Sequence, residues 1–207
     1  MATFQGSGTF TVQGSSGRIH DCNFGSSATL EITGERTELR NVIVSGTLDV
    51  SANYVHCSDS SIRTTTWSGH SGSITDTLVI VGAITVTGAR TKILGCIFSS
   101  AQGIDIQADG CLVSDNIFYR VSSGHDCVSV AGDRNLIQSN KFEPLVASTK
   151  SAVNILSGEC NMVWGNDLGD PDDYATDALI DAGANTQLFY PNDATYGDNL
   201  TDCGTGS

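Results

Sequence analysis

Positive charge, proline and long apolar runs are all scarce in this chain of 207 residues. Ten Lys and Arg residues stand against 23 Asp and Glu residues, which gives a formal net charge of −13, and there are only three prolines. The shortage of positive charge argues against nucleic-acid binding, because affinity for phosphates comes largely from Lys and Arg side chains. No apolar run approaches the ~20 residues of a membrane-spanning helix, and the N-terminus has no basic segment followed by an apolar one. We therefore expect neither a membrane span nor a secretory signal.

Helix-forming patterns are missing as well. No segment repeats apolar residues at the spacing of a surface helix, whereas the chain holds 23 glycines and is rich in Ser, Thr and Asn. Charged residues make up 16% and apolar residues 39% of the chain, a balance that excludes an acidic disordered tail. The length and composition together predict one all-β domain.

A loose repeat organises most of the chain. Residues 132–142 serve as its template: Gly at the first place, a small polar residue at the fourth, an aliphatic residue at the sixth, Asn or Cys at the ninth, and Phe or an aliphatic residue at the eleventh. Because the length variation falls between the copies, the period is roughly 16 to 26 residues. Clear copies begin at Gly14, Gly34, Gly88, Ala108, Gly132, Gly158 and Gly183, and two weaker ones begin near Ala52 and Gly72.

A shorter pattern, apolar-x-apolar, closes each repeat and is typical of one face of a β-strand. One unit cannot bury its apolar stripes alone, so the units are expected to stack, with parallel strands ~4.8 Å apart. The pairs are Phe10/Val12, Leu30/Ile32, Leu48/Val50, Ile84/Val86, Ile104/Ile106, Val128/Val130, Val153/Ile155 and the weaker Ala178/Ile180.

These repeats resemble those of the right-handed parallel β-helix (pectate-lyase-like) superfamily over roughly residues 9 to 190. The resemblance implies a right-handed single-stranded parallel β-helix of about nine coils, spanning residues 14–188. Residues 1–13 would then form an N-terminal cap or anchor, and residues 189–207 a C-terminal cap and tail. The fold by itself does not identify an activity.

Stacked coils would align the ninth-place residues Asn116, Asn140 and Asn166. We expect an amide ladder that satisfies buried backbone groups, although an amide row that recognises a sugar is the alternative. The eleventh-place aromatics should stack inside the column as core residues. They are Phe24, Phe98, Phe118 and Phe142.

The catalytic motifs of the superfamily's lyases and hydrolases do not match this sequence. Asn-Thr-Asp, Gly-His-Gly and Arg-Ile-Lys are all missing, and the acidic stretch 167–177 lacks calcium-loop spacing. Glu31 and Asp49 align one coil apart but should face solvent, and residues 125–127 (His-Asp-Cys) point in alternate directions on a strand. We therefore predict no catalytic residue, no metal site and no cofactor.

Seven cysteines are present, none of them in a Cys-x-x-Cys pair, which argues against zinc. Cys22 and Cys96 fall four coils apart, too far for a disulfide, and no other pair within the chain follows from the repeat. One interpretation is that Cys22, Cys96 and Cys111 fill the column as buried thiols. The other is that exposed cysteines cross-link neighbouring chains; the candidates are Cys203, followed by Cys57, Cys127 and Cys160.

The resemblance further implies a virion component, since phage tailspikes, fibres and capsid decoration proteins use this fold and assemble as trimers. We expect a non-enzymatic homotrimeric capsid decoration or spike protein, assembled in the host cytoplasm and in contact with other virion proteins. Phe189, Tyr190 and Tyr196 are candidate anchors. The alternative is a tailspike-type domain that binds or depolymerises polysaccharide. The aromatics left over from the core for that role are Trp67, Trp164, Tyr54 and Tyr119.

Overall fold

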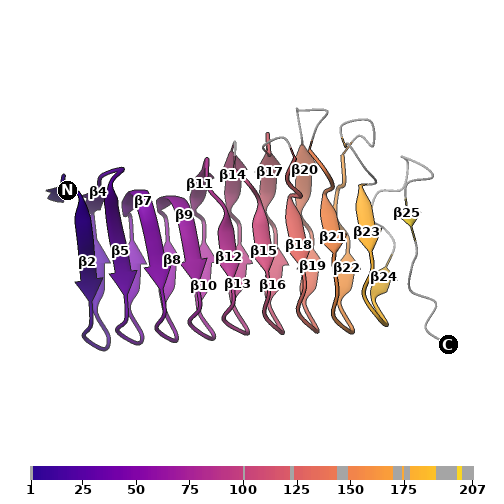
Figure 1. Ribbon diagram of the computed structural model, residues 1–207, viewed down its shortest axis with the longest axis horizontal. Coiled ribbons are helices and arrows are strands. Elements are labelled where there is room, and N and C mark those ends of the chain that lie inside the picture. The colour runs from indigo at the N-terminus through magenta and orange to yellow at the C-terminus, as the bar shows by residue number, and fades with distance from the viewer. Residues whose placement is uncertain are drawn as a thin grey trace.

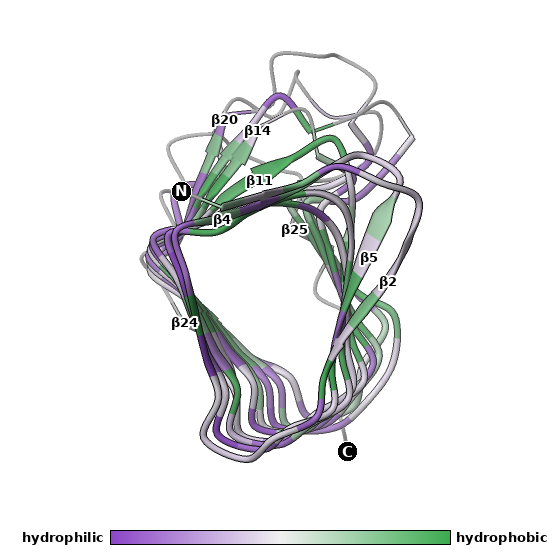
Figure 2. Cartoon of the chain, turned by 90° about the vertical axis from the view of Figure 1, so that its left-hand side faces the viewer, coloured by the Kyte–Doolittle hydropathy of each residue, from purple (hydrophilic) through white to green (hydrophobic). Residues whose placement is uncertain are grey.

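The computed structural model describes residues 2–99, 101–121, 124–143, 149–169, 174, 178–189 and 200–201. Within these residues the chain forms 25 β-strands and no helix. The strands wind into a solenoid with three sides, seen from the flank in Figure 1 and end-on in Figure 2. Successive laps place equivalent strands on the same side, and these equivalent strands pair with one another.

Side 1 and side 2 belong to one sheet of 16 strands, because β7 (Ile43–Val50) and β9 (Ser61–Trp67) run around the corner between them. Side 1 holds the first halves of β7 and β9 with β1 (Ala2–Phe4), β4 (Cys22–Phe24), β11 (Leu78–Ile80), β14 (Ile97–Ser99), β17 (Ile117–Tyr119) and β20 (Lys141–Glu143). Side 2 holds the second halves with β2 (Gly8–Val12), β5 (Ala28–Ile32), β12 (Ile84–Val86), β15 (Ile104–Ile106), β18 (Val128–Val130), β21 (Val153–Ile155), β23 (Leu179–Asp181) and β25 (Leu200–Thr201).

Side 3 is a separate sheet of nine strands. Its strands are β3 (Arg18–His20), β6 (Glu38–Arg40), β8 (His56–Ser58), β10 (Ser73–Thr75), β13 (Lys92–Leu94), β16 (Leu112–Ser114), β19 (Leu136–Gln138), β22 (Met162–Trp164) and β24 (Gln187–Phe189). The neighbours in all three sides are parallel and in register; Ile74, Ile93 and Val113, for example, are aligned across β10, β13 and β16. The expected parallel β-helix is thereby confirmed.

The solenoid makes about seven complete turns, somewhat fewer than the nine coils expected. Side 3 has nine strands because the chain crosses that side nine times. The first and the last of these crossings belong to the laps at the two ends of the solenoid. At the N-terminal end, β1 and β2 already pair with β4 and β5. The winding therefore begins before residue 14, where the sequence boundary had placed the cap. At the other end, β25 pairs with β23, so Leu200 and Thr201 also belong to side 2.

The core is the column enclosed by the three sides. Phe98, Phe118 and Phe142 are fully buried and stack with ring centroids 4.5 and 4.8 Å apart, which confirms their expected place. Trp67 is also fully buried, so its assignment to the outer surface was wrong. It aligns with Val50 and Val86 on the inner face of side 2, where the apolar-x-apolar pattern continues through Thr65 and Trp67.

Candidate functional site

The three ladder asparagines lie directly above one another inside the column, at the corner between sides 3 and 1. The Asn116 backbone N–H and side-chain amide both donate to Asn140 Oδ1, at 3.1 and 2.9 Å. Asn140 makes the same two bonds to Asn166 Oδ1, each at 3.0 Å. In the lap before, the Cys96 N–H donates to Asn116 Oδ1 at 2.9 Å. These amides are buried and are occupied by the backbone, so they present no face to a ligand.

A second ladder, which the sequence reasoning missed, lies at the corner between sides 2 and 3. The Cys111 N–H donates to Asn135 Oδ1 at 2.8 Å, and the Asn135 N–H donates to Asn161 Oδ1 at 2.9 Å. Both asparagines are buried at the fourth place of the repeat. The small polar residue noted at that place was the signal for it.

Two of the cysteines proposed for cross-linking are inaccessible. Cys57 on β8 and Cys127 before β18 are fully buried, so neither thiol can reach a neighbouring chain, and that prediction was wrong for both. Burial raises the pKa of the Cys57 thiol to about 11 and that of Cys127 well above its usual value. Cys160 is exposed and stays a candidate, whereas Cys203 lies outside the described residues.

The buried-thiol interpretation fits two of its three cysteines. Cys96 and Cys111 are buried, and burial raises the pKa of both, that of Cys96 to about 12. Cys22 is only half-buried; it lies on β4 near the N-terminal end of the rod. The predicted anchors Tyr190 and Tyr196, and the side chain of Phe189, lie outside the described residues.

Two of the carboxylates that could serve catalysis, those of Glu31 and Asp126, accept hydrogen bonds from neighbouring side chains. Glu31 and Asp49 are paired in register on the outer face of side 2, and Glu31 accepts a hydrogen bond from Thr11 Oγ1 at 2.8 Å. Asp126 Oδ2 accepts from the Asn154 side chain at 3.0 Å, while the neighbouring Cys127 is buried. Within the described part of the chain, no group of three or more His, Cys, Asp and Glu residues is arranged to hold a metal ion.

The remaining aromatics do not form a platform for sugars. Tyr54 lies at a turn between sides 2 and 3 and stacks under Arg36, with the guanidinium carbon 5.6 Å from the ring centroid. Trp164 is exposed on side 3, and Tyr119 is half-buried on side 1 beneath Arg120. Three different places on the rod therefore carry one ring each.

The most distinctive outer surface is an apolar area on side 1. Its aliphatic side chains are 36–46% exposed. They lie on the consecutive side-1 strands β11, β14 and β17 and at Val81, the residue that follows β11. Figure 2 shows β11 and β14 in the hydrophobic colour. We call this surface the side-1 patch; it consists of Leu78, Ile80, Val81, Ile97 and Ile117.

The register makes the patch a straight row. Leu78, Ile97 and Ile117 are direct partners across β11, β14 and β17, so their outward side chains follow each other at ~4.8 Å. Charge begins at the C-terminal rim of the row, where Lys141 aligns with Ile117 and forms an ion pair with Glu143. An apolar centre with a charged rim is the usual anatomy of a protein–protein interface.

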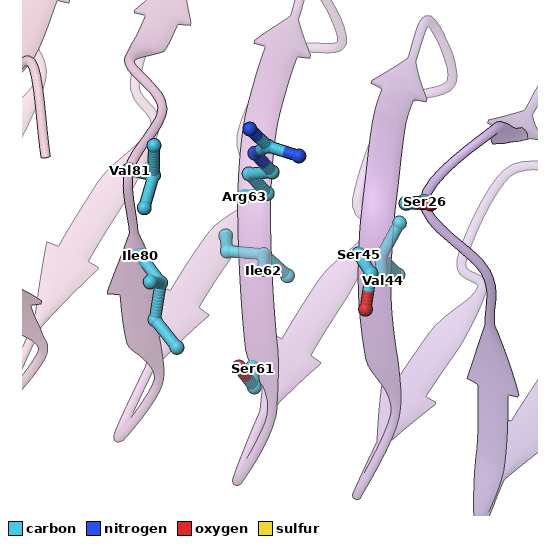
Figure 3. A pocket seen from close by; sticks show the side chains of 8 residues that line it. All are labelled: Ser26, Val44, Ser45, Ser61, Ile62, Arg63, Ile80 and Val81. Atoms are coloured by element: carbon cyan, nitrogen blue, oxygen red, sulfur yellow. The ribbon is translucent and has the colours of Figure 1, made fainter.

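A groove of about 240 Å³ continues the patch toward the N-terminal end. Figure 3 shows its floor on β7 and β9 and one wall on β11, made by Ile80 and Val81. It is hollow because serines stand where the later laps carry larger outward side chains. Its lining consists of Ser26, Val44, Ser45, Ser61, Ile62, Arg63, Ile80 and Val81.

Val81 is held in a strained backbone conformation at the edge of this groove. Its φ is +68°, in the left-handed region that a β-branched residue rarely adopts. Its N–H reaches the Ser99 carbonyl only at 3.4 Å, and its side chain is 46% exposed. Strain and exposure together at one aliphatic residue are typical of a functional surface rather than of a turn optimised for stability.

No protein-family model matches the sequence, and the searches of curated proteins and of solved structures find no match either. The described residues contain no helix that is long and apolar enough to cross a membrane.

Proposed function

We propose that this protein is a non-enzymatic structural component of a phage virion, a homotrimeric β-solenoid rod that serves as a capsid decoration or spike protein. The observation that carries the proposal is the side-1 patch, a row of exposed aliphatic residues aligned across consecutive laps. Soluble single chains rarely leave a contiguous apolar area of several hundred Å² uncovered.

Copies of the same chain are the occupants that fit the patch best. The chain carries a net charge of −13, so two rods repel each other over most of their surface, while the patch itself carries no charged side chain. A straight row with one side chain per lap is complementary to the same row on a parallel copy, because both repeat at the strand spacing. Three such rods around one axis would cover all three patches in a closed assembly.

The chemistry-bearing groups of the chain support a structural role. The buried thiols are packed, the internal asparagines hydrogen-bond to backbone groups, and Glu31 is engaged by Thr11. A rod built in this way gains its stability from repeated stacking and offers a long, regular surface to neighbouring proteins.

Light scattering coupled to size exclusion tests the assembly. The wild-type protein should have three times the 21.6 kDa mass of one chain. The double variant Ile97→Asp/Ile117→Asp should run as a single chain, because charge replaces the centre of the patch. Leu112→Asp/Leu136→Asp is the matched control, since these aligned leucines are half-buried on the outer face of side 3. A single-chain mass for the wild type, or a patch variant that stays trimeric, would contradict the proposal.

A second measurement tests the location. Antibodies against the chain should decorate purified particles of the phage whose genome encodes it, at regular positions on the capsid or tail in electron micrographs. Particles that carry no label, with the chain recovered only from the host lysate, would exclude a virion component.

A further inference from the structure

The turn between side 2 and side 3 carries an outer ladder of a different kind. In successive laps, a side chain at one position accepts a hydrogen bond from the backbone N–H of the equivalent residue in the next lap. Asn53 Oδ1 accepts from the His70 N–H at 2.9 Å, and His70 Nδ1 accepts from the Ala89 N–H at 3.1 Å. Farther along, Asp109 Oδ1 accepts from the Asp133 N–H at 2.8 Å. Asp133 Oδ1 in turn accepts from the Glu159 N–H at 2.9 Å.

The ladder is interrupted at one rung. Ala89 has no side-chain acceptor, so the Asp109 N–H that follows it has no hydrogen-bond partner among the described residues. The adjoining backbone is satisfied, since the Arg90 N–H donates to the Asp109 carbonyl at 2.9 Å. The neighbouring laps supply a side-chain acceptor at this position, His70 Nδ1 before the interruption and Asp109 Oδ1 after it, whereas Ala89 supplies none.

A notch of about 400 Å³ opens at this interruption. Gly110 contributes no side chain to it, and Arg90 reaches across, with its Cγ 3.7 Å from where a Cβ of Gly110 would lie. The next lap supplies Arg134, and the lap before supplies His70. The lining residues are His70, Ala89, Arg90, Asp109, Gly110 and Arg134.

Neither arginine at the notch has an ionic partner among the described residues. The four ion pairs found in the described part of the chain involve Arg18, Arg40, His20 and Lys141, but neither Arg90 nor Arg134. Only ten residues of the chain are Lys or Arg, so two unpaired guanidinium groups beside one unpaired backbone donor are a marked concentration. The carboxylate at the rim, that of Asp109, is already an acceptor for the Asp133 N–H.

We propose that this notch binds the carboxylate group of a small molecule. One oxygen of the ligand accepts from the Asp109 N–H, taking the place that the Asp109 and Asp133 side chains fill in the following laps. The other oxygen faces the guanidinium groups of Arg90 and Arg134, which favour planar oxyanions. The site does not depend on the assembly proposed above.

The test is a titration of the deuterated, ¹⁵N-labelled protein with sodium glucuronate at constant ionic strength, followed by TROSY spectra. The Asp109 amide signal should shift saturably, and the Arg90→Gln/Arg134→Gln variant should weaken the binding at least tenfold. Arg63→Gln is the matched control, because it removes an exposed arginine at the side-1 groove, and it should leave the binding unchanged.

Ala89→Asp provides a second, independent readout. Its carboxylate should complete the ladder, raise the melting temperature without ligand and abolish the glucuronate shift, whereas glucuronate should raise the melting temperature of the wild type alone. An Asp109 amide that does not move, an equal shift in Ala89→Asp, or an equal shift with sodium chloride would overturn the proposal. Tenfold tighter binding of inorganic phosphate than of glucuronate would overturn the assignment to a carboxylate.

Discussion

Single asparagine side chains connect successive laps at two corners of the column. Each amide accepts from the backbone N–H of the preceding lap, and at the corner between sides 3 and 1 it also donates to a backbone carbonyl of an earlier lap. A buried donor left without a partner costs about 1–3 kcal/mol, so each rung matters more than its own hydrogen bond suggests.

Replacing the middle rung tests this at the residue scale. Asn140→Ala removes the acceptor of the Asn116 N–H and the donor to the Val113 carbonyl, and should lower the free energy of unfolding by about 3 kcal/mol. Gln138→Ala is the control, because Gln138 points outward two residues away, and it should cost less than about 0.5 kcal/mol. If Asn140→Ala and Gln138→Ala lowered the free energy of unfolding equally in urea titrations, the buried position of Asn140 in the ladder would add no stability, which would contradict the prediction.

The buried thiols predict a dependence of stability on alkaline pH. Burial raises the pKa of Cys57 to about 11 and of Cys96 to about 12, while unfolded thiols titrate near ~8.5. Between these values the unfolded chain loses protons that the folded one keeps, so the free energy of unfolding should fall as the pH rises from about 9 to 11. Cys57→Ala/Cys96→Ala should flatten that fall in urea titrations. A variant whose slope equals that of the wild type would contradict the assignment.

At the scale of the strand, the end of β11 combines strain with exposure. Val81→Asn keeps a side chain at the groove and suits a positive φ, so it should raise the free energy of unfolding by about 1 kcal/mol. Ile80→Asn, next to it on β11 and not among the positive-φ residues, is the control and should not stabilise. Thermal unfolding in which both variants lose stability would mean that Val81 is not strained.

The sequence predicts the elements well where their inward residues repeat without interruption. The pairs Ile84/Val86 and Ile104/Ile106 are strands β12 and β15, aligned as expected. The repeat is hard to recognise in the sequence between Gly34 and Gly88, because the laps there are short and β7 and β9 run around a corner as single strands. For that reason the inward position of Trp67 is not evident from the sequence.

The buried position of Cys57 and the side-1 patch could not be predicted from the sequence, because both depend on the register between laps. Cys57 reads as a loop residue until its lap is aligned with Leu39 and Ile74, which place it on the inner face of side 3. The apolar row on side 1 joins residues about 20 positions apart, so it becomes visible only once the register is known. The interrupted turn ladder is equally invisible, since it depends on hydrogen bonds between laps.

At the scale of the whole molecule, the rod is acidic and regular, and the exposed aliphatic side chains of the side-1 patch run along one of its sides. Its N-terminal lap is largely exposed, and Phe4 and Phe10 pack there around Phe24. The side-1 patch and the notch lie on different parts of the rod, because the notch is at the turn between sides 2 and 3. Assembly through side 1 therefore leaves the notch open to solvent.

Chemical cross-linking at the side-1 patch is the most direct test of the central claim, which is that side 1 forms the contact between copies. In a background with Cys22→Ser, Cys160→Ser and Cys203→Ser, Ile97→Cys should be joined between chains by a short bismaleimide, because the side-1 patches of neighbouring copies lie at the shared axis. Leu112→Cys on side 3 should remain a single chain under the same treatment. Equal cross-linking of the two variants, or none in either, would contradict the account.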